Sequence, residues 1–112
     1  MNTEKKLEHV KNALLSAVGD TYHYFTPAQK EDRYILWYET GTREMMWADN
    51  LMESQTFTGH AIYFTPEEYD PAIDKIQDAM NGAGIGFRLV AVEFDADTRY
   101  IAYIWEWEYG GY

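Results

Sequence analysis

The chain has 112 residues and carries nine Lys and Arg against nineteen Asp and Glu, a formal net charge of −10 at neutral pH. This charge argues against a groove that grips phosphates, because nucleic-acid affinity comes largely from clustered cations. The absence of cysteine excludes disulfides, cysteine nucleophiles and thiolate metal sites. No apolar run approaches the roughly 20 residues that span a bilayer, and the charged N-terminal stretch lacks a signal-peptide core. We therefore expect one soluble domain over residues 1–112, made and kept in a cytoplasm.

The first predicted element is a helix over residues 4–18. Thr3 is placed to cap its start, and the helix dipole favours Glu4 in the first turn. Its apolar residues fall at spacings of three and four and form one buried stripe: Leu7, Val10, Leu14 and Val18. Gly19 is a natural stop.

Three strands are predicted next, over residues 22–25, 33–39 and 56–64. The second is apolar on both sides, and we expect Gly41 to end it. Gly59 lies inside the third strand, where a glycine indicates a bulge or a close approach of another chain segment.

The connection 42–54, TREMMWADNLMES, has no clean period of either kind. It holds five large apolar residues: Met45, Met46, Trp47, Leu51 and Met52. A loop folded back onto the core or a short packed helix over 44–52 explains them about as well as a docking arm does. Methionines and a tryptophan suit an adaptable contact surface, so these five residues are interface candidates.

The second helix has two competing starts. Thr65-Pro-Glu-Glu68 has the pattern of a capping box, and Asp70-Pro71 has that of a cap followed by proline at the first helical position. A helix through both would place Pro71 in its interior, which proline disfavours. We therefore predict a loose turn at 66–69 and a helix over 71–82. Its expected buried stripe is Ala72, Ile73, Ile76 and Met80.

A hairpin is predicted after the glycine-rich exit of this helix, with strands 87–94 and 99–109 around a turn at 95–98. The order α-β-β-β-α-β-β predicts an α+β fold, a mainly antiparallel sheet with two helices packed on one face.

Aromatic residues gather in the predicted strands, since all of the nineteen except Trp47, Tyr69 and Tyr112 lie there. Two helices can cover only one face of a five-stranded sheet, and soluble monomers rarely leave so large an apolar patch open. Either the sheet curls over itself, or its tyrosines tolerate water, or another chain covers them.

The last strand ends in strict alternation, with Glu106 and Glu108 on the face expected to meet solvent. Trp105, Trp107 and Tyr109 then face protein, and we predict that at least one of them contacts a neighbouring subunit.

No constellation of an enzyme is visible in the sequence. His9, His23 and His60 lie on a helix and two separate strands, without the short spacings of a metal site. Asp95 and Asp97 fit a hairpin turn better than a calcium loop. The glycines of 81–86 follow a helix, whereas a phosphate-binding loop joins a strand to one. We predict neither catalytic residues nor a cofactor or metal.

The chain resembles the small tail-terminator and tail-completion proteins of long-tailed bacteriophages and prophages. Three stretches carry the resemblance: Trp47-Ala-Asp-Asn50, Gly59–Thr65 leading into Tyr69–Gln77, and the hairpin end Tyr103–Glu108. Together with the element order, the resemblance covers nearly the whole chain.

The resemblance implies a structural protein of the virion tail or neck, assembled in the host cytoplasm. Such proteins form a homo-oligomeric ring, usually a hexamer, that caps the tail tube and stops its polymerisation. The ring's partners are the tail tube protein and the head connector or head-closure protein. DNA passes through the lumen without specific binding, and an acidic lumen would repel it within the Debye length of about 8–10 Å.

Two other functions remain open at this point. A head-closure protein or another phage neck component has a similar length and composition. A monomeric acidic inhibitor that mimics DNA would need carboxylates along one surface, whereas the acidic residues here fall on separate elements. A small enzyme with an undetected site is the least favoured interpretation.

Overall fold

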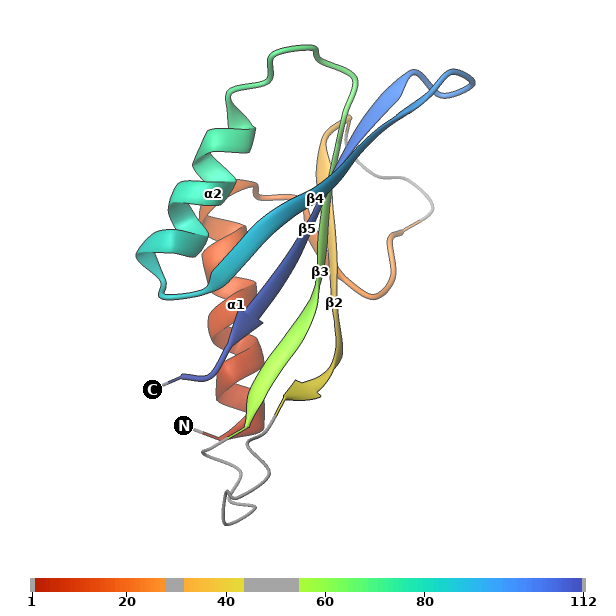
Figure 1. The fold of residues 1–112 in the computed structure, drawn as a ribbon. Helices are drawn as coiled ribbons and strands as arrows, with labels where there is room; N and C mark the ends of the chain where they lie inside the picture. The colour runs from red at the N-terminus through yellow and green to blue at the C-terminus, as the bar shows by residue number, and fades with distance from the viewer. Residues whose placement is uncertain (1, 28–31, 44–54, 112) are drawn as a thin grey trace.

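A computed structural model describes residues 2–27, 32–43 and 55–111 of the chain. Two helices, α1 (Thr3–Ala17) and α2 (Ala72–Gly82), pack on one face of a five-stranded sheet (Figure 1). The strands are β1 (Thr21–His23), β2 (Tyr34–Arg43), β3 (Thr56–Thr65), β4 (Gly86–Asp95) and β5 (Tyr100–Tyr109). The predicted α+β class and element order are confirmed.

The spatial order of the sheet is β1-β2-β3-β5-β4. β1 runs parallel to β2, and every other neighbouring pair is antiparallel. β3 and β5 therefore lie at the centre, while β4 forms one edge. The β4–β5 hairpin projects away from the two helices, as Figure 1 shows.

The N-terminal helix begins one residue earlier than its sequence predicted. The side chain of Asn2 accepts a hydrogen bond from the backbone N–H of Lys5 at 2.9 Å, so Asn2 and not Thr3 is the N-cap. The helix ends at Ala17, before Gly19. Its buried side includes Val10 and Leu14, as expected, and also Lys6, whose Nζ donates to the carbonyl of Gln55 at 2.6 Å.

The ends of the first two strands also differ from prediction. β1 stops at His23 because Tyr24 takes a left-handed backbone conformation with φ of 68°, which a strand cannot continue through. Gly41 does not end β2, contrary to our prediction. The strand bulges between Glu39 and Gly41, and pairing with β3 then resumes through Arg43.

The core lies between the helices and the odd-numbered residues of the central strands. Opposite residues of an antiparallel pair share a face, so Trp37, Ala61 and Trp105 form one row across the sheet. The helices supply Val10, Leu14, Ile76 and Met80 to the same cluster. The predicted stripes of both helices are thus confirmed at their central positions, and both helices cover one sheet face as expected.

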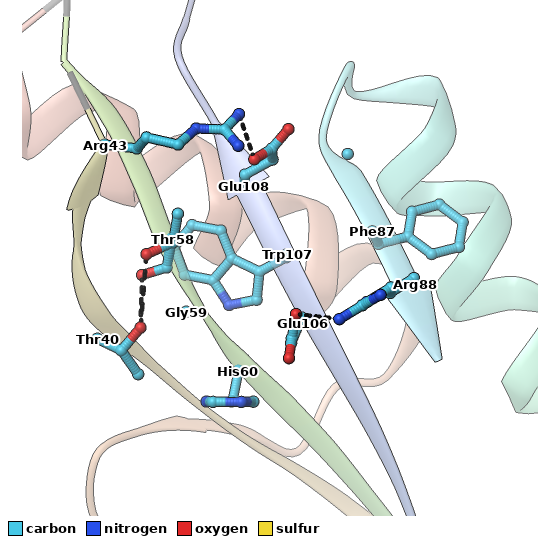
Figure 2. Close-up of a pocket in the computed structure, with 11 residues that line it drawn as sticks. Thr40, Arg43, Thr58, Gly59, His60, Phe87, Arg88, Glu106, Trp107 and Glu108 are labelled. Atoms are coloured by element: carbon cyan, nitrogen blue, oxygen red, sulfur yellow. Dashed lines mark hydrogen bonds and ion pairs between the residues drawn. The ribbon is translucent and has the colours of Figure 1, made fainter. Parts of the chain in front are cut away.

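Gly59 of β3 lies beside the backbone of β2 and the ring of Trp107 (Figure 2). A Cβ on this residue would stand 2.2 Å from the carbonyl oxygen of Tyr38 and 2.5 Å from the ring of Trp107. The expected close approach is therefore present, while the bulge lies opposite, on β2.

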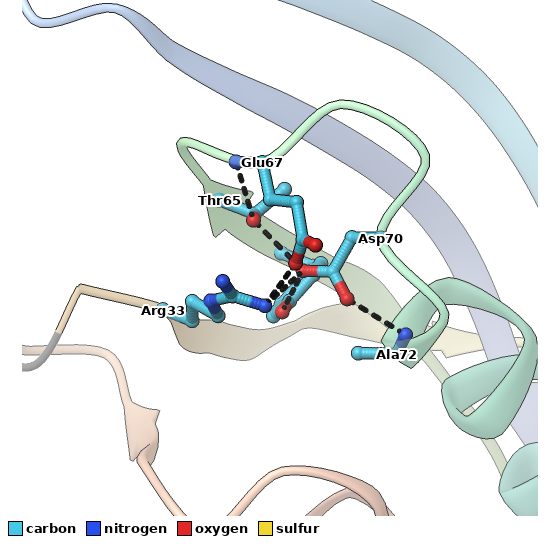
Figure 3. A network of polar contacts seen from close by, with 6 residues as sticks. Arg33, Thr65, Glu67, Asp70 and Ala72 are labelled. Carbon is cyan, nitrogen blue, oxygen red and sulfur yellow. Dashed lines mark hydrogen bonds and ion pairs between the residues drawn. The ribbon is translucent and has the colours of Figure 1, made fainter.

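A buried carboxylate holds the start of α2 against the sheet (Figure 3). Asp70 accepts hydrogen bonds from the Tyr63 hydroxyl at 2.6 Å, the Thr65 hydroxyl at 2.8 Å and the backbone N–H of Ala72 at 2.8 Å. Arg33 reaches Asp70 at 3.3 Å and also pairs with Glu67. The predicted start at Asp70-Pro71 is confirmed to within one residue, and 66–69 stay outside the helix.

The charge of Asp70 is favoured despite its burial. Burial alone would raise its pKa, but the hydrogen bonds from Tyr63, Ala72 and Thr65 and the Arg33 guanidinium together lower that pKa below its ordinary value. Burial and the bond to Asp70 in turn raise the pKa of Tyr63, so its hydroxyl remains a donor.

Replacing Gly59 by alanine tests the close approach. We expect Gly59→Ala to lower the free energy of unfolding by at least about 2 kcal/mol, because its new methyl group must displace a backbone carbonyl and an indole ring. The matched control is Gly41→Ala, where nothing lies within 4 Å of the new atom. Urea unfolding of the two variants measures the difference. Equal stabilities would contradict the packing of Trp107 against β3.

Replacing Asp70 by asparagine tests the network. We expect Asp70→Asn to cost roughly 2 kcal/mol at pH 7, because it removes a buried charge that its donors and Arg33 stabilise. Since the folded pKa of Asp70 is lowered, this stability is present above the ordinary carboxyl pKa and is lost as pH falls through the folded value. The gap between wild type and variant should therefore close in acid. The exposed Asp78→Asn on the same helix is the control, and a gap that is independent of pH would contradict the assignment.

Candidate functional site

The even-numbered residues of the central strands form the sheet face opposite the helices, here called the open face. The strand register places Leu36, Ile62 and Ile104 in one row across it, and Tyr34, Phe64 and Ala102 in the next. Except for the buried Tyr34, these side chains are half-buried, and no described helix packs on them. The expected surplus of apolar sheet surface is therefore present, and it consists mainly of aliphatic side chains with Tyr34, Tyr38 and Phe64.

One end of the open face is polar. A pocket of about 620 Å³ lies there, bordered by Thr58, His60 and two ion pairs (Figure 2). Arg43 contacts Glu108 at 2.7 Å, and Arg88 contacts Glu106 at 3.3 Å. Both pairs are substantially exposed, so each contributes little to stability. Their main effect is to balance charge at this end of the sheet.

Among the described residues, the edge strand β4 carries the largest group of exposed apolar side chains. Leu89, Val90, Val92 and Phe94 are 43%, 40%, 52% and 63% exposed. Among the described strands β4 pairs with β5 alone, so its outward backbone groups have no strand partner. Only a bulge between Leu89 and Ala91 interrupts this edge. A long apolar edge of this kind is a template for pairing with another chain.

Trp105, Trp107 and Tyr109 lie inside the chain's own core, at 0%, 2% and 9% exposure. They face the helices: Trp105 donates its indole N–H to Gln77 of α2 at 3.1 Å, and the ring of Tyr109 stacks on His9 of α1 at 4.5 Å. The prediction that one of them contacts a neighbouring subunit is wrong, because the helices already cover that face of β5. Glu106 points to the opposite face, as predicted, and is exposed.

The other interface candidates, Met45, Met46, Trp47, Leu51 and Met52, lie outside the described residues. The exposed residues of β4 were not among the candidates, because a predicted strand over 87–94 does not reveal whether it is central or an edge. A run such as Leu-Val-Ala-Val, apolar on both sides, is typical of a central strand.

Of the residues singled out in the sequence, His9, His23 and Asp95 have hydrogen-bond partners, whereas the Nδ1 of His60 is buried without one among the described residues. His9 Nε2 lies 2.8 Å from the carbonyl of Ala83, and His23 Nε2 lies 2.7 Å from Glu39. Asp95 accepts the backbone N–H of Asp97 at 2.9 Å, which confirms its place in the hairpin turn. Within the described part of the chain, no three His, Asp or Glu side chains are grouped to hold a metal ion.

Comparison with protein-family models and with curated proteins found no match to this chain. Among the described helices, neither is long and apolar enough to cross a membrane.

Substituting Trp105 separates a core role from an interface role. We expect Trp105→Phe to lower the free energy of unfolding by roughly 2 kcal/mol, because it removes buried volume and the bond to Gln77. Leu89→Ala, at an exposed position, should change stability by less than about 1 kcal/mol. Thermal unfolding compares the two variants. A Trp105→Phe protein of wild-type stability would contradict the core placement.

Proposed function

We propose that this chain is a structural protein of the phage tail-terminator type. In this proposal it forms a homo-oligomeric ring that caps the tail tube, stops tube polymerisation and joins the tail to the head connector. The sequence resemblance is one support, and the α+β fold with its element order agrees with it. The surface of the molecule supplies a second and independent support.

The exposed apolar edge of β4 carries the proposal. The register places Leu89 opposite Trp105, Val92 opposite Tyr103 and Phe94 opposite Ile101, all on the helix-bearing face of the sheet. The hairpin projects away from the helices (Figure 1), and all three side chains are exposed. Burying them against another copy would remove apolar surface from water.

The geometry favours a ring over a closed dimer. The projecting hairpin and the open face are different surfaces of the same molecule, and each offers apolar side chains. A contact of one copy's hairpin with the open face of the next is heterologous, and such contacts close into a ring when the rotation allows. The net charge of −10 suits a lumen through which DNA slides without binding.

Sedimentation velocity across concentration, with negative-stain imaging, tests the ring. We expect the wild-type protein to associate as its concentration rises, and Phe94→Glu to remain monomeric because it places a charge in the proposed contact. Leu15→Glu is the matched control, since Leu15 is an exposed apolar residue on α1, away from the hairpin. It should associate as the wild type does.

Two results would contradict the proposal. One is a protein that stays monomeric up to millimolar concentration and binds a DNA-processing enzyme stoichiometrically, as a DNA mimic would. The other is a Phe94→Glu variant that assembles normally. Adding the protein to polymerising tail tubes then separates a terminator, which stops elongation, from a head-closure protein, which leaves the tubes growing.

A further inference from the structure

A second pocket lies on the open face, at the end opposite the two ion pairs. Its volume is about 570 Å³, and its lining includes Tyr34, Phe64, Tyr100, Ala102, Glu93 and Asp95. We call it the aromatic pocket. These residues come from four different strands, so the pocket depends on the assembled sheet and not on a single loop.

The strand register explains why a hollow forms there. Tyr34, Phe64, Ala102 and Glu93 occupy one row across β2, β3, β5 and β4. Ala102 is the small member of this row, so a gap opens above it between the ring of Phe64 and the side chain of Glu93. In the adjoining row Asp95 lies opposite Tyr100, which places a carboxylate and a ring at the outer end of the same gap.

The aromatic wall of the pocket is ordered by its own contacts. The rings of Tyr34 and Phe64 stack with centroids 4.7 Å apart, and Tyr100 approaches Tyr34 at 6.5 Å. Tyr34 is 6% exposed. Burial, with the neighbouring Tyr100, raises the pKa of the Tyr34 hydroxyl, so this wall is uncharged at neutral pH.

The opposite wall carries two carboxylates that no described cation neutralises. Glu93 and Asp95 are both exposed, and neither forms an ion pair with any residue that the structure describes. The described residues that line the pocket include no Lys, Arg or His. At the other end of the same sheet face, by contrast, each glutamate has an arginine partner.

We propose that the aromatic pocket binds an arginine side chain presented by a partner protein. The guanidinium group is planar and delocalised, so it stacks on an aromatic face while its N–H groups reach carboxylates at its edge. The pocket offers these two features on facing walls. A lysine ammonium is more strongly hydrated and does not stack, and a neutral side chain leaves both carboxylates without a partner.

An NMR titration of ¹⁵N-labelled wild-type protein with Nα-acetyl-argininamide tests this site. We expect saturable shifts at Phe64 and over residues 93–102, with a dissociation constant on the order of millimolar for so small a probe. Nα-acetyl-citrullinamide has nearly the same shape without the charge. Its dissociation constant should be at least roughly tenfold higher. Nα-acetyl-lysinamide should also bind more weakly.

Two variants assign the binding to this pocket. Asp95→Asn with Glu93→Gln should weaken argininamide binding roughly tenfold, and the asparagine retains an oxygen for the turn hydrogen bond to Asp97. Asp97→Asn is the control. It lies in the same turn but does not line the pocket, so binding should change by less than about twofold.

Each contrary outcome overturns a stated part of the inference. No saturable shift, or equal binding of citrullinamide, excludes recognition of a guanidinium. Equal binding of lysinamide excludes arginine selectivity, and much tighter binding of free L-arginine than of the capped probe excludes a protein-borne ligand. The titration with citrullinamide uses the wild-type protein, so it decides the question even if the double variant does not fold.

This site does not depend on the ring. A monomeric protein that binds argininamide would keep the pocket and overturn the proposed assembly. A protein that forms rings without binding argininamide would support the proposed assembly and overturn the arginine site.

Discussion

The sheet depends on two small residues of β3, Gly59 and Ala61. Indole rings from both sides occupy the space above them, because Ala61 lies between Trp37 and Trp105 and Gly59 lies under Trp107. A larger side chain at either position would push the strands or the helices apart. The fit also determines register, since a shift by one residue would turn every indole to the opposite face.

This arrangement packs the core on the helix-bearing side of the central strands. Val10, Leu14, Ile76 and Met80 close over the indoles, and Asp70 attaches the start of α2 to Tyr63 and Thr65 of β3. With its start held there, α2 lies over the central strands, and the β4–β5 hairpin projects away from it (Figure 1). The apolar residues of the hairpin and of the open face are therefore left to solvent or to another chain. The proposed assembly follows from that surplus.

The open face also separates two kinds of surface. At one end Arg43 and Arg88 balance Glu108 and Glu106, whereas at the other end Glu93 and Asp95 stand beside aromatic rings without a cation. This asymmetry distinguishes the ends of a sheet whose central rows are simply apolar. In the proposed ring, one copy's hairpin covers the centre of the face, and the aromatic pocket adds a site for a cationic side chain.

Much of the fold could be predicted from periodicity. The spacing of Val10 and Leu14 identified the buried side of α1, and the proline at 71 identified the start of α2 to within one residue. The bulge at Gly41 could not be foreseen, because a glycine ends a strand as readily as it bends one. The prediction that Thr3 and not Asn2 caps α1 was wrong, because both side chains offer an oxygen that can accept the backbone N–H groups of the first turn.

The surface was predicted less well than the fold. Alternation correctly separated Trp105 and Trp107 from Glu106, but it does not show which layer covers each face, and the helices proved to cover the tryptophans. Likewise, nothing in the residues of β4 marks it as an edge. That position follows from β5 pairing with β3, a contact between segments about 40 residues apart in the sequence. The function proposed from the resemblance remains a prediction.

Amide hydrogen exchange, followed residue by residue in dilute and in concentrated protein, tests the proposed interface most directly. If copies assemble through the hairpin, the outward N–H groups of β4, which are free of β5, gain protection as the protein associates. The amides of α1 should exchange at the same rate in both conditions. Association that leaves the exchange of β4 unchanged would contradict the proposed assembly and place the interface elsewhere.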